Sequence, residues 1–247
     1  MEGLVVILFI GAFIGLAVLG FIMEKKRREA FALLAAQLGL QYTQEKDWNL
    51  ANRYSFLDKL AQGSNRYAYN ILSGKYQGQE VKVFDYHYET HSRDSKGRRK
   101  THHHHFSFFM LMLERQFPEV TIGPEGIFSK IAQAFGYDDI DFESHEFSRR
   151  FCVRAADKKF AYDFCHTRMM EYLLANPDLM VEIEGLVLAV AFSRCLAPEQ
   201  IPGNLDRLVT LRTLMPEYLF NNRWHAHLTH RPRRHSAAPS PVCDRAV

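Results

Sequence analysis

The sequence predicts an α+β fold, in which an N-terminal transmembrane helix is followed by a mostly antiparallel sheet with packed helices. Three observations support this prediction. Residues 4–23 form one uncharged apolar stretch, and runs of alternating apolar and polar residues follow from residue 66 onward. Short helical patterns lie between the later runs. Strands and helices that are mixed along a chain with short links are typical of α+β domains.

Residues 1–23 are predicted to be a transmembrane anchor. The stretch "LVVILFIGAFIGLAVLGFIM", from Leu4 to Met23, carries no charged side chain. A helix of this length spans roughly 30 Å, the thickness of the hydrocarbon layer of a bilayer. A cleaved signal peptide would have a basic start and a shorter apolar core. An uncleaved anchor in the lipid bilayer is therefore the favoured interpretation.

Basic residues follow the apolar stretch directly, and none precedes it. By the positive-inside rule, this predicts a single-pass protein of the bacterial inner (plasma) membrane, with the N-terminus outside and the C-terminal domain cytoplasmic. The four cysteines form no C-x-x-C pair, which is typical of reduced thiols in a reducing compartment. Gly11 and Gly15 have the G-x-x-x-G spacing that lets two helices approach closely. A homodimer through these glycines is one prediction, and ordinary helix glycines are the alternative.

The rest of the chain divides into three predicted parts. Residues 24–65 are predicted to be a juxtamembrane helix and a connector, because apolar residues recur at helical spacing from Phe31 to Leu38. Residues 66–220 are predicted to form a cytoplasmic α+β domain. Residues 221–247 lose all periodicity and are rich in Arg, His, Pro and Ser, so a disordered tail is predicted there.

Within the domain, two strands are predicted around Gly74 and Gly78, and a β-hairpin is predicted over roughly residues 80–114. Alternation along the first hairpin strand predicts that its two faces are lined by different side chains. The later patterns predict a short strand and turn at 119–126, a helix at 127–135, a strand at 147–155, one helix at 157–175 with Asp157 as N-cap, a strand pair at 179–194 and a broken helix at 198–220.

Two stretches resemble a bacterial domain-of-unknown-function family whose members are often membrane-anchored. They are "LSGKYQGQEVKVFDYHYET", residues 72–90, and "DIDFESHEFSRRFCVRAADKKFAYDFCHTRMMEYLLA", residues 139–175. With the order of the elements between them, the resemblance covers most of residues 30–220. It implies an intact domain on a membrane anchor, and it implies no activity because the family has none assigned. The tail beyond Phe220 departs from the resemblance.

Four consecutive histidines open the second strand of the predicted hairpin. If His91 lies opposite Thr101, then Glu89 faces His103, and three imidazoles and one carboxylate meet on one face of the hairpin. Such a set suits zinc or another transition metal. A pairing shifted by one residue would separate the ligands, and a solvated, pH-sensitive strand end is the alternative. The predicted metal ligands are His87, Glu89, His103 and His105.

Positive charge is concentrated in residues 24–29, in residues 93–100 and in the tail, so the remainder of the chain is acidic. A domain of that sign argues against nucleic-acid binding, which needs a basic face. The first two clusters are instead predicted to contact the surface of an anionic membrane. The hairpin histidines would add positive charge there as the pH falls. The predicted membrane-surface contacts are Lys25, Lys26, Arg27, Arg28, Arg98, Arg99 and Lys100.

No motif names a reaction. The chain has no G-x-S-x-G, no Walker loop and no G-x-G-x-x-G, and it offers no catalytic or cofactor-binding residue. The acidic run from Asp139 imitates a calcium loop, but its twelfth position is Arg150 instead of Glu. No cofactor is expected apart from a transition metal at the histidines. The favoured function is an interaction domain that binds an unknown protein partner or the membrane surface. The alternatives are a metal- or pH-responsive sensor and an enzyme with an unreadable active site.

Overall fold

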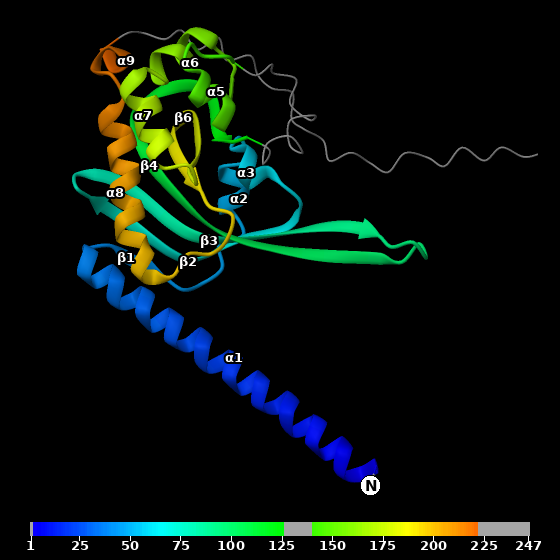
Figure 1. The fold of residues 1–247 in the computed structure, drawn as a ribbon. Helices are drawn as coiled ribbons and strands as arrows, with labels where there is room; N and C mark the ends of the chain where they lie inside the picture. Colours follow the sequence, from blue (N-terminus) through cyan, green and yellow to red (C-terminus); the bar gives the residue numbers. More distant parts are fainter. Residues whose placement is uncertain (1, 126–139, 222–247) are drawn as a thin grey trace, which may run out of the picture.

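The computed structural model describes residues 2–125 and 140–221, and within the first helix the side chains of residues 2–8 and of Ala12 lie outside that description. As predicted, the fold is α+β, with an antiparallel sheet and packed helices (Figure 1). The strands are β1 (Gln41–Thr43), β2 (Ser64–Tyr76), β3 (Gln79–Arg93), β4 (Arg99–Pro124), β5 (Phe151–Ala155) and β6 (Met180–Ala191). The helices are α1 (Glu2–Leu38), α2 (Leu50–Arg53), α3 (Asp58–Ala61), α5 (His145–Arg150), α6 (Lys158–Phe164), α7 (Thr167–Ala175), the 3-10 turn η1 (Pro198–Gln200), α8 (Ile201–Leu214) and α9 (Glu217–Asn221).

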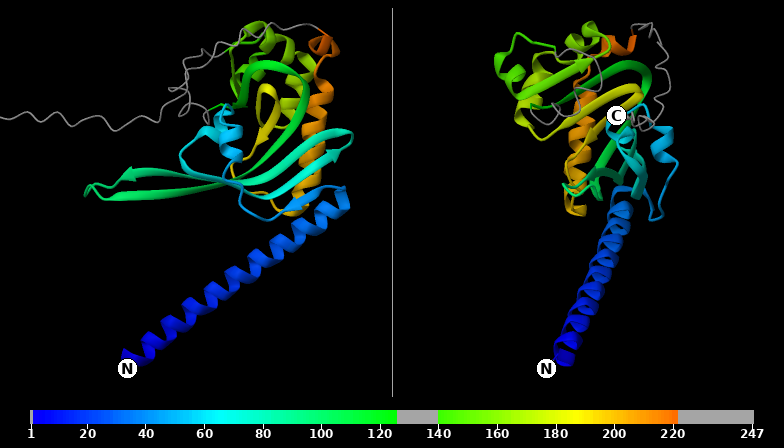
Figure 2. Two further views of the ribbon diagram at one scale, coloured as in Figure 1. Left: turned by 180° about the vertical axis from the view of Figure 1, so that it is seen from behind. Right: turned by 90° about the vertical axis from the view of Figure 1, so that its right-hand side faces the viewer.

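The strand β4 organises the sheet. The strands β1, β2, β3, β4 and β5 lie in that order, and β6 also pairs with β4. The first part of β4 pairs with β3, and its later part pairs with β5 and β6 (Figure 2). Because β4 is 26 residues long, its first residues extend beyond the sheet together with β3. These two strands form a two-stranded hairpin there.

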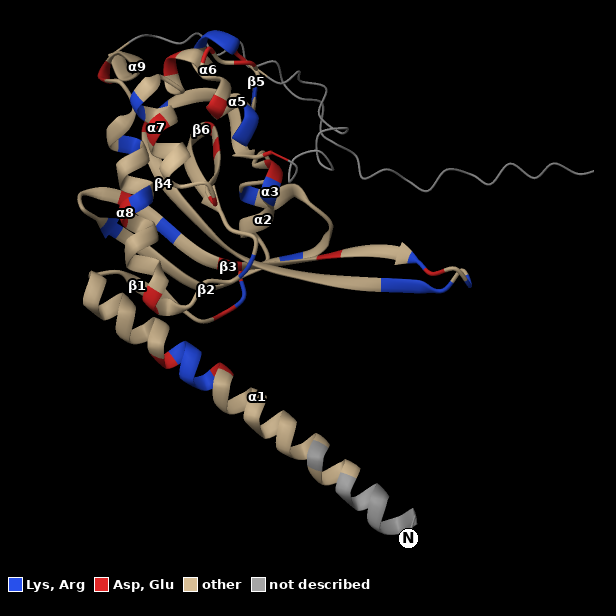
Figure 3. Ribbon diagram, in the orientation of Figure 1, with Lys and Arg blue, Asp and Glu red and all other residues tan. Residues whose placement is uncertain are grey.

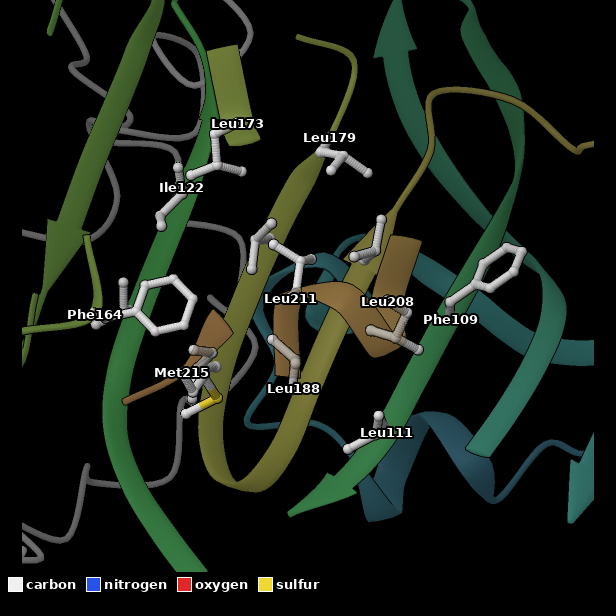
Figure 4. Close-up of a cluster of buried hydrophobic side chains, with 14 of the residues drawn as sticks. Phe109, Leu111, Ile122, Phe164, Leu173, Leu179, Leu188, Leu208, Leu211 and Met215 are labelled. Atoms are coloured by element: carbon white, nitrogen blue, oxygen red, sulfur yellow. The ribbon is translucent and has the colours of Figure 1, made fainter. Parts of the chain in front are cut away.

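Both faces of the sheet are buried by helices. Because successive side chains of a strand point to opposite faces, Val83 packs in one core and Phe84 in the other. The larger core also holds side chains from α8 (Figure 4) and from the C-terminal half of α1. The smaller core is covered by α2 and α3. The predicted alternation along the first hairpin strand is therefore confirmed, and both of its faces are largely buried between Val81 and Tyr88.

Several predicted elements differ in detail from the structure. The expected strand at 147–155 begins as a helix, because Ser144 caps α5 by accepting a hydrogen bond from the backbone N–H of Phe147. The strand itself starts at Phe151. Asp157 is the N-cap that the sequence predicted, with its carboxylate 3.1 Å from the backbone nitrogen of Phe160. The expected single helix, however, stops after α6 and restarts as α7.

Two further elements were predicted with the wrong extent. The short strand at 119–126 is the end of β4, and the strand pair at 179–194 is the single strand β6. Gly185 adopts a φ of 59° in β6, beside the irregular pairing with β4. Glycine accommodates this positive φ without strain, so the strand bends there and continues. The helix predicted at 127–135 lies entirely outside the described residues, as does nearly all of the tail predicted to be disordered.

The helix α1 runs without a break into the domain, where Phe31, Leu34 and Ala35 are buried against the sheet. Across the residues whose side chains the structure describes, no helix combines the length and the apolar character needed to cross a membrane. This finding contradicts the predicted single-pass inner-membrane location with the N-terminus outside and the domain cytoplasmic. The predicted N-terminal helix is present, but its transmembrane placement is not confirmed.

Candidate metal site at the base of the hairpin

The candidate site lies where the β3–β4 hairpin leaves the sheet. The strand β2 begins at Ser64, which pairs with Glu89 of β3. Beyond this point β3 and β4 pair only with each other, as far as Arg93 and Arg99, and the hairpin projects from the domain (Figure 1). Its tip is closed by the Asp94 carboxylate, which accepts hydrogen bonds from two backbone N–H groups of the turn.

The pairing of β3 with β4 is the one on which the predicted site depends. His91 pairs with Thr101, and Glu89 pairs with His103. Two-residue alternation then places the side chains of His87, Glu89 and His103 on one face of the hairpin. Residues 106–111 of β4, which pair with residues 81–86 of β3, are buried in the two cores, so a shift by one residue would expose apolar side chains. The cores therefore fix the relative position of the histidines.

Three possible ligand atoms converge at this point. The side chains of His87, Glu89 and His103 each offer one atom within 4.8 Å of the others. His87 Nε2 lies 3.2 Å from His103 Nδ1, and His103 Nδ1 lies 3.4 Å from Glu89 Oε1. A zinc ion bound by imidazole and carboxylate at about 2.0–2.2 Å in tetrahedral geometry holds neighbouring ligand atoms about 3.3 Å apart. Two of the three separations already match this spacing.

The hydrogen bonds around His87 fix which of its nitrogens can bind a metal. His87 Nδ1 lies 3.0 Å from the backbone carbonyl oxygen of Asn65. A carbonyl oxygen only accepts hydrogen bonds, so Nδ1 carries the proton and the lone pair is on Nε2. The ring is 3% exposed and stacks on Tyr67, with the ring centres 4.5 Å apart. The Nε2 lone pair is thus held toward His103, as in protein metal sites where a ligand histidine donates its other N–H.

Asn65 also orients the carboxylate. Its side-chain amide donates a hydrogen bond to Glu89 Oε1 over 2.6 Å. This bond, together with the nearby His103, lowers the pKa of Glu89 below its ordinary value, so the carboxylate is charged at neutral pH. Sequence analysis missed Asn65, because the domain was predicted to start one residue later. The signal was present in "GSN", since asparagine tolerates the positive φ of 50° that this position adopts.

The remaining histidines of the run are directed elsewhere. His105, predicted as a fourth ligand, has its Nδ1 3.1 Å from the Tyr69 hydroxyl, outside the group of converging atoms. Burial, followed by the neighbouring His87 and His103, lowers the pKa of His105. On the opposite face, His104 stacks on Tyr88, and His102 lies 2.9 Å from the Ser92 hydroxyl. The structure therefore brings together three of the four predicted ligands.

The predicted membrane-surface residues fall into three groups. Lys26, Arg99 and Lys100 are exposed, and the positive charge at the hairpin tip is visible in Figure 3. Arg27 instead points into the domain, where its Nη2 lies 2.8 Å from Asp85 Oδ2. The other predicted contacts form ion pairs within their own helix or turn, namely Lys25 with Glu29, Arg28 with Glu24 and Arg98 with Asp94.

Comparison with known proteins places only the fold. Neither a protein-family model nor a curated protein matches the sequence. The resemblance to a domain-of-unknown-function family therefore stays a prediction. The crystal structure of the mycobacterial trehalose monomycolate transport factor A, TtfA, matches with a TM-score of 0.53 and 15% sequence identity, over 77% of this chain and 95% of that chain. A likeness at this identity shows the shared α+β fold alone.

Proposed function

We propose that this protein is a metal-responsive interaction domain, in which His87, Glu89 and His103 bind Zn²⁺ or a similar transition-metal ion. The convergence of their three ligand atoms, at spacings that suit a tetrahedral ion, carries the proposal. The charged carboxylate and the oriented His87 ring support it, because both are prepared to bind before an ion arrives. A water molecule or a side chain of a partner would complete the coordination.

Metal binding at this place would stiffen the projecting hairpin. A two-stranded hairpin is marginally stable by itself. The ion would join β3 to β4. Through the hydrogen bonds of Asn65 it would also join both strands to the first residues of β2, at the point where the hairpin leaves the sheet. The tip would then be held in one orientation relative to the sheet. Metal occupancy would thereby control how the tip is presented to a partner.

The tip itself suggests an anionic partner. Residues 93–100 carry five basic residues and one acidic residue at the end of the hairpin. We favour an anionic membrane surface, because attraction to it needs only a basic, accessible loop and no shaped pocket. An acidic protein surface is the competing partner. Vesicles with and without anionic lipid, mixed with the metal-loaded full-length chain, separate the two.

The metal site is tested by titrating Zn²⁺ into the full-length chain against a chromophoric chelator, with elemental analysis for stoichiometry. The informative pair of variants is His103→Gln and His102→Gln, since these neighbours lie on opposite faces of the same strand. We expect one tightly bound zinc per chain in the wild type and in His102→Gln, and at least 100-fold weaker binding in His103→Gln. Equal weakening in both variants would mean that the histidine run binds metal without a built site.

A second variant examines the supporting residue. Asn65→Gly keeps the positive φ of the backbone and removes the amide that holds Glu89. Loss of such supporting hydrogen bonds lowers metal affinity by about 10- to 100-fold. An unchanged zinc affinity in Asn65→Gly would show that the Asn65 amide does not support metal binding through Glu89.

A further inference from the structure

A cavity of about 980 Å³ lies between the middle of α1 and the sheet. The helix contributes Met23, Arg27 and Ala30 to its wall, and β2 contributes Tyr67 and Tyr69. This volume is at the upper end of the range for small-molecule sites. Nothing in the proposed metal function uses it.

Two cations reach the cavity from different walls. The Nη2 group of Arg27 donates hydrogen bonds to the Asp85 carboxylate and to the Leu196 carbonyl oxygen, and the donor–acceptor distance is 2.8 Å in both. Within the part of the chain that the structure describes, its donors on Nη1 and Nε make no further hydrogen bond, so they can bind a ligand. On the other wall, the Lys46 ammonium group lies 4.2 Å from the centre of the Tyr67 ring. A guanidinium and an ammonium group across one cavity suit a carboxylate or a phosphate.

Acidic residues also border the cavity, so its charge balance matters. Glu24 forms an ion pair with Arg28, which itself lines the cavity. Glu45 and Glu199 belong to the lining as well. The carboxylate of Asp85 is 1% exposed and lies behind Arg27, so a ligand does not meet it directly. The region around Arg27 and Lys46 is therefore the part of the wall that favours an anion.

The exposed part of α1 is apolar on all sides, since Phe21 and Ile22 are exposed as well as Met23, and one apolar stripe on it leads into the same cavity. Met23 is 65% exposed at the cavity wall, and Leu19 and Leu16 precede it at spacings of four and three residues with 57% and 70% exposure. Residues at this spacing lie on one side of a helix. The stripe therefore ends next to Arg27, one helical turn further along. A ligand with an anionic head and an apolar chain complements this order of groups.

We propose that the cavity binds a single-chain amphiphile with an oxyanion head, placed between Arg27 and Lys46, with its chain along Met23, Leu19 and Leu16. The head chemistry is shared by a fatty-acid carboxylate and by a phosphate monoester. Covering the stripe removes apolar surface from water, which strengthens binding by up to about fourfold for each methylene group that is fully buried. The proposal does not depend on metal binding at the hairpin.

The test is calorimetric titration of the full-length chain with ten-carbon amphiphiles below their micelle concentrations, in the presence of a chelator. Decanoate and decyl phosphate are the anionic probes, decyl maltoside is the neutral one and decyltrimethylammonium is the cationic one. We expect one saturable site that prefers the anionic probes at least 10-fold, and octyl homologues that bind more weakly. The better of the two anionic probes identifies the head. Inorganic phosphate without a chain should bind at least 100-fold more weakly.

Paired variants locate the site. Lys46→Gln should weaken the anionic probes about 10-fold and leave the neutral probe unchanged, whereas Lys75→Gln, an exposed lysine outside the cavity lining, should change neither. Ala30→Trp should obstruct the cavity beside Arg27 and weaken binding of the anionic probes at least 10-fold, whereas Ala36→Trp on the exposed side of the same helix should not. Equal binding of all head groups, or equal effects within each pair, would overturn the proposal and reduce the binding to nonspecific coating of α1.

Discussion

The ion pair between Arg27 and Asp85 is expected to hold α1 on the sheet. Asp85 is buried in the centre of β3, and its second oxygen accepts a hydrogen bond from Ser107 over 2.7 Å. Arg27→Met keeps a similar chain volume but leaves this buried carboxylate without its countercharge. Two unit charges about 4 Å apart at an effective dielectric constant of about 20 attract by about 4 kcal/mol. The Arg27 side chain is 29% exposed, so we expect about 3 kcal/mol of lost stability.

The assay is a double-mutant cycle in urea unfolding. Asp85→Asn leaves Arg27 partly hydrated and should cost about 2 kcal/mol, because Arg27 can still reach water. The double variant should cost clearly less than the sum of the single variants, which gives a coupling energy of about 2–3 kcal/mol. The control cycle uses Lys25→Met and Glu29→Gln on the same helix. That exposed pair, 3.9 Å apart, should couple by less than about 0.5 kcal/mol.

A coupling energy for Arg27 and Asp85 no larger than that of the control cycle would refute this reasoning. It would mean that the buried α1 side chains of Phe31, Leu34 and Ala35 hold the helix on the sheet without help from the ion pair. Unfolding by fluorescence and by circular dichroism should coincide in every variant. Separate transitions would show that α1 detaches before the domain unfolds.

Three further outcomes are expected. The pKa of His105 is lower in the folded chain, so as the pH falls the imidazole is protonated first in the unfolded chain. The free energy of unfolding should therefore fall as the pH drops below about 6.5. The urea midpoint of His105→Gln should change less between pH 7.5 and 5.5 than that of the wild type. Burial raises the pKa of Glu182 to about 8, so its contribution to stability is lost as the pH rises from about 4.5 to 8, and Glu182→Gln should gain thermal stability over the wild type at pH 8.5 but little at pH 5. Gly63→Ala should cost more than about 3 kcal/mol, because a Cβ there overlaps the Glu89 carbonyl oxygen, whereas Gly97→Ala, also at positive φ but in open space, should cost about 1 kcal/mol in the same thermal assay.

The pairing of the hairpin strands could be predicted from the sequence because apolar side chains fill both faces of the sheet beneath it. Val83 and Phe84 alternate into different cores, and only one pairing keeps their neighbours on β4 buried as well. The histidines beyond the cores inherit that pairing. The sequence pattern alone left this pairing and one shifted by one residue open, and the buried cores decide in favour of Glu89 opposite His103.

The rest of the site depends on contacts that leave no local pattern. Asn65 reaches Glu89 across 24 residues of sequence, and Arg27 reaches Asp85 across 58. Asn70 adopts a φ of 50° within β2, where the pairing with β3 shifts, and its amide then bonds to Asp85. Such a bulge redirects a side chain without breaking the alternation that a sequence reveals. The same limit applies to α1, whose apolar composition predicted a membrane span that the structure does not support.

The proposed metal site and the proposed amphiphile site share a wall. Tyr67 lines the cavity and stacks on His87, while Tyr69 lines the cavity and bonds to His105, whose ring lies 4.7 Å from that of His87. A ligand that moves either tyrosine must also change how His87 presents its Nε2 atom. Because coupling between two binding sites is reciprocal, metal at the hairpin would alter amphiphile affinity by the same factor. The burial of His87 beneath Tyr67 thus gives the hairpin a physical connection to α1.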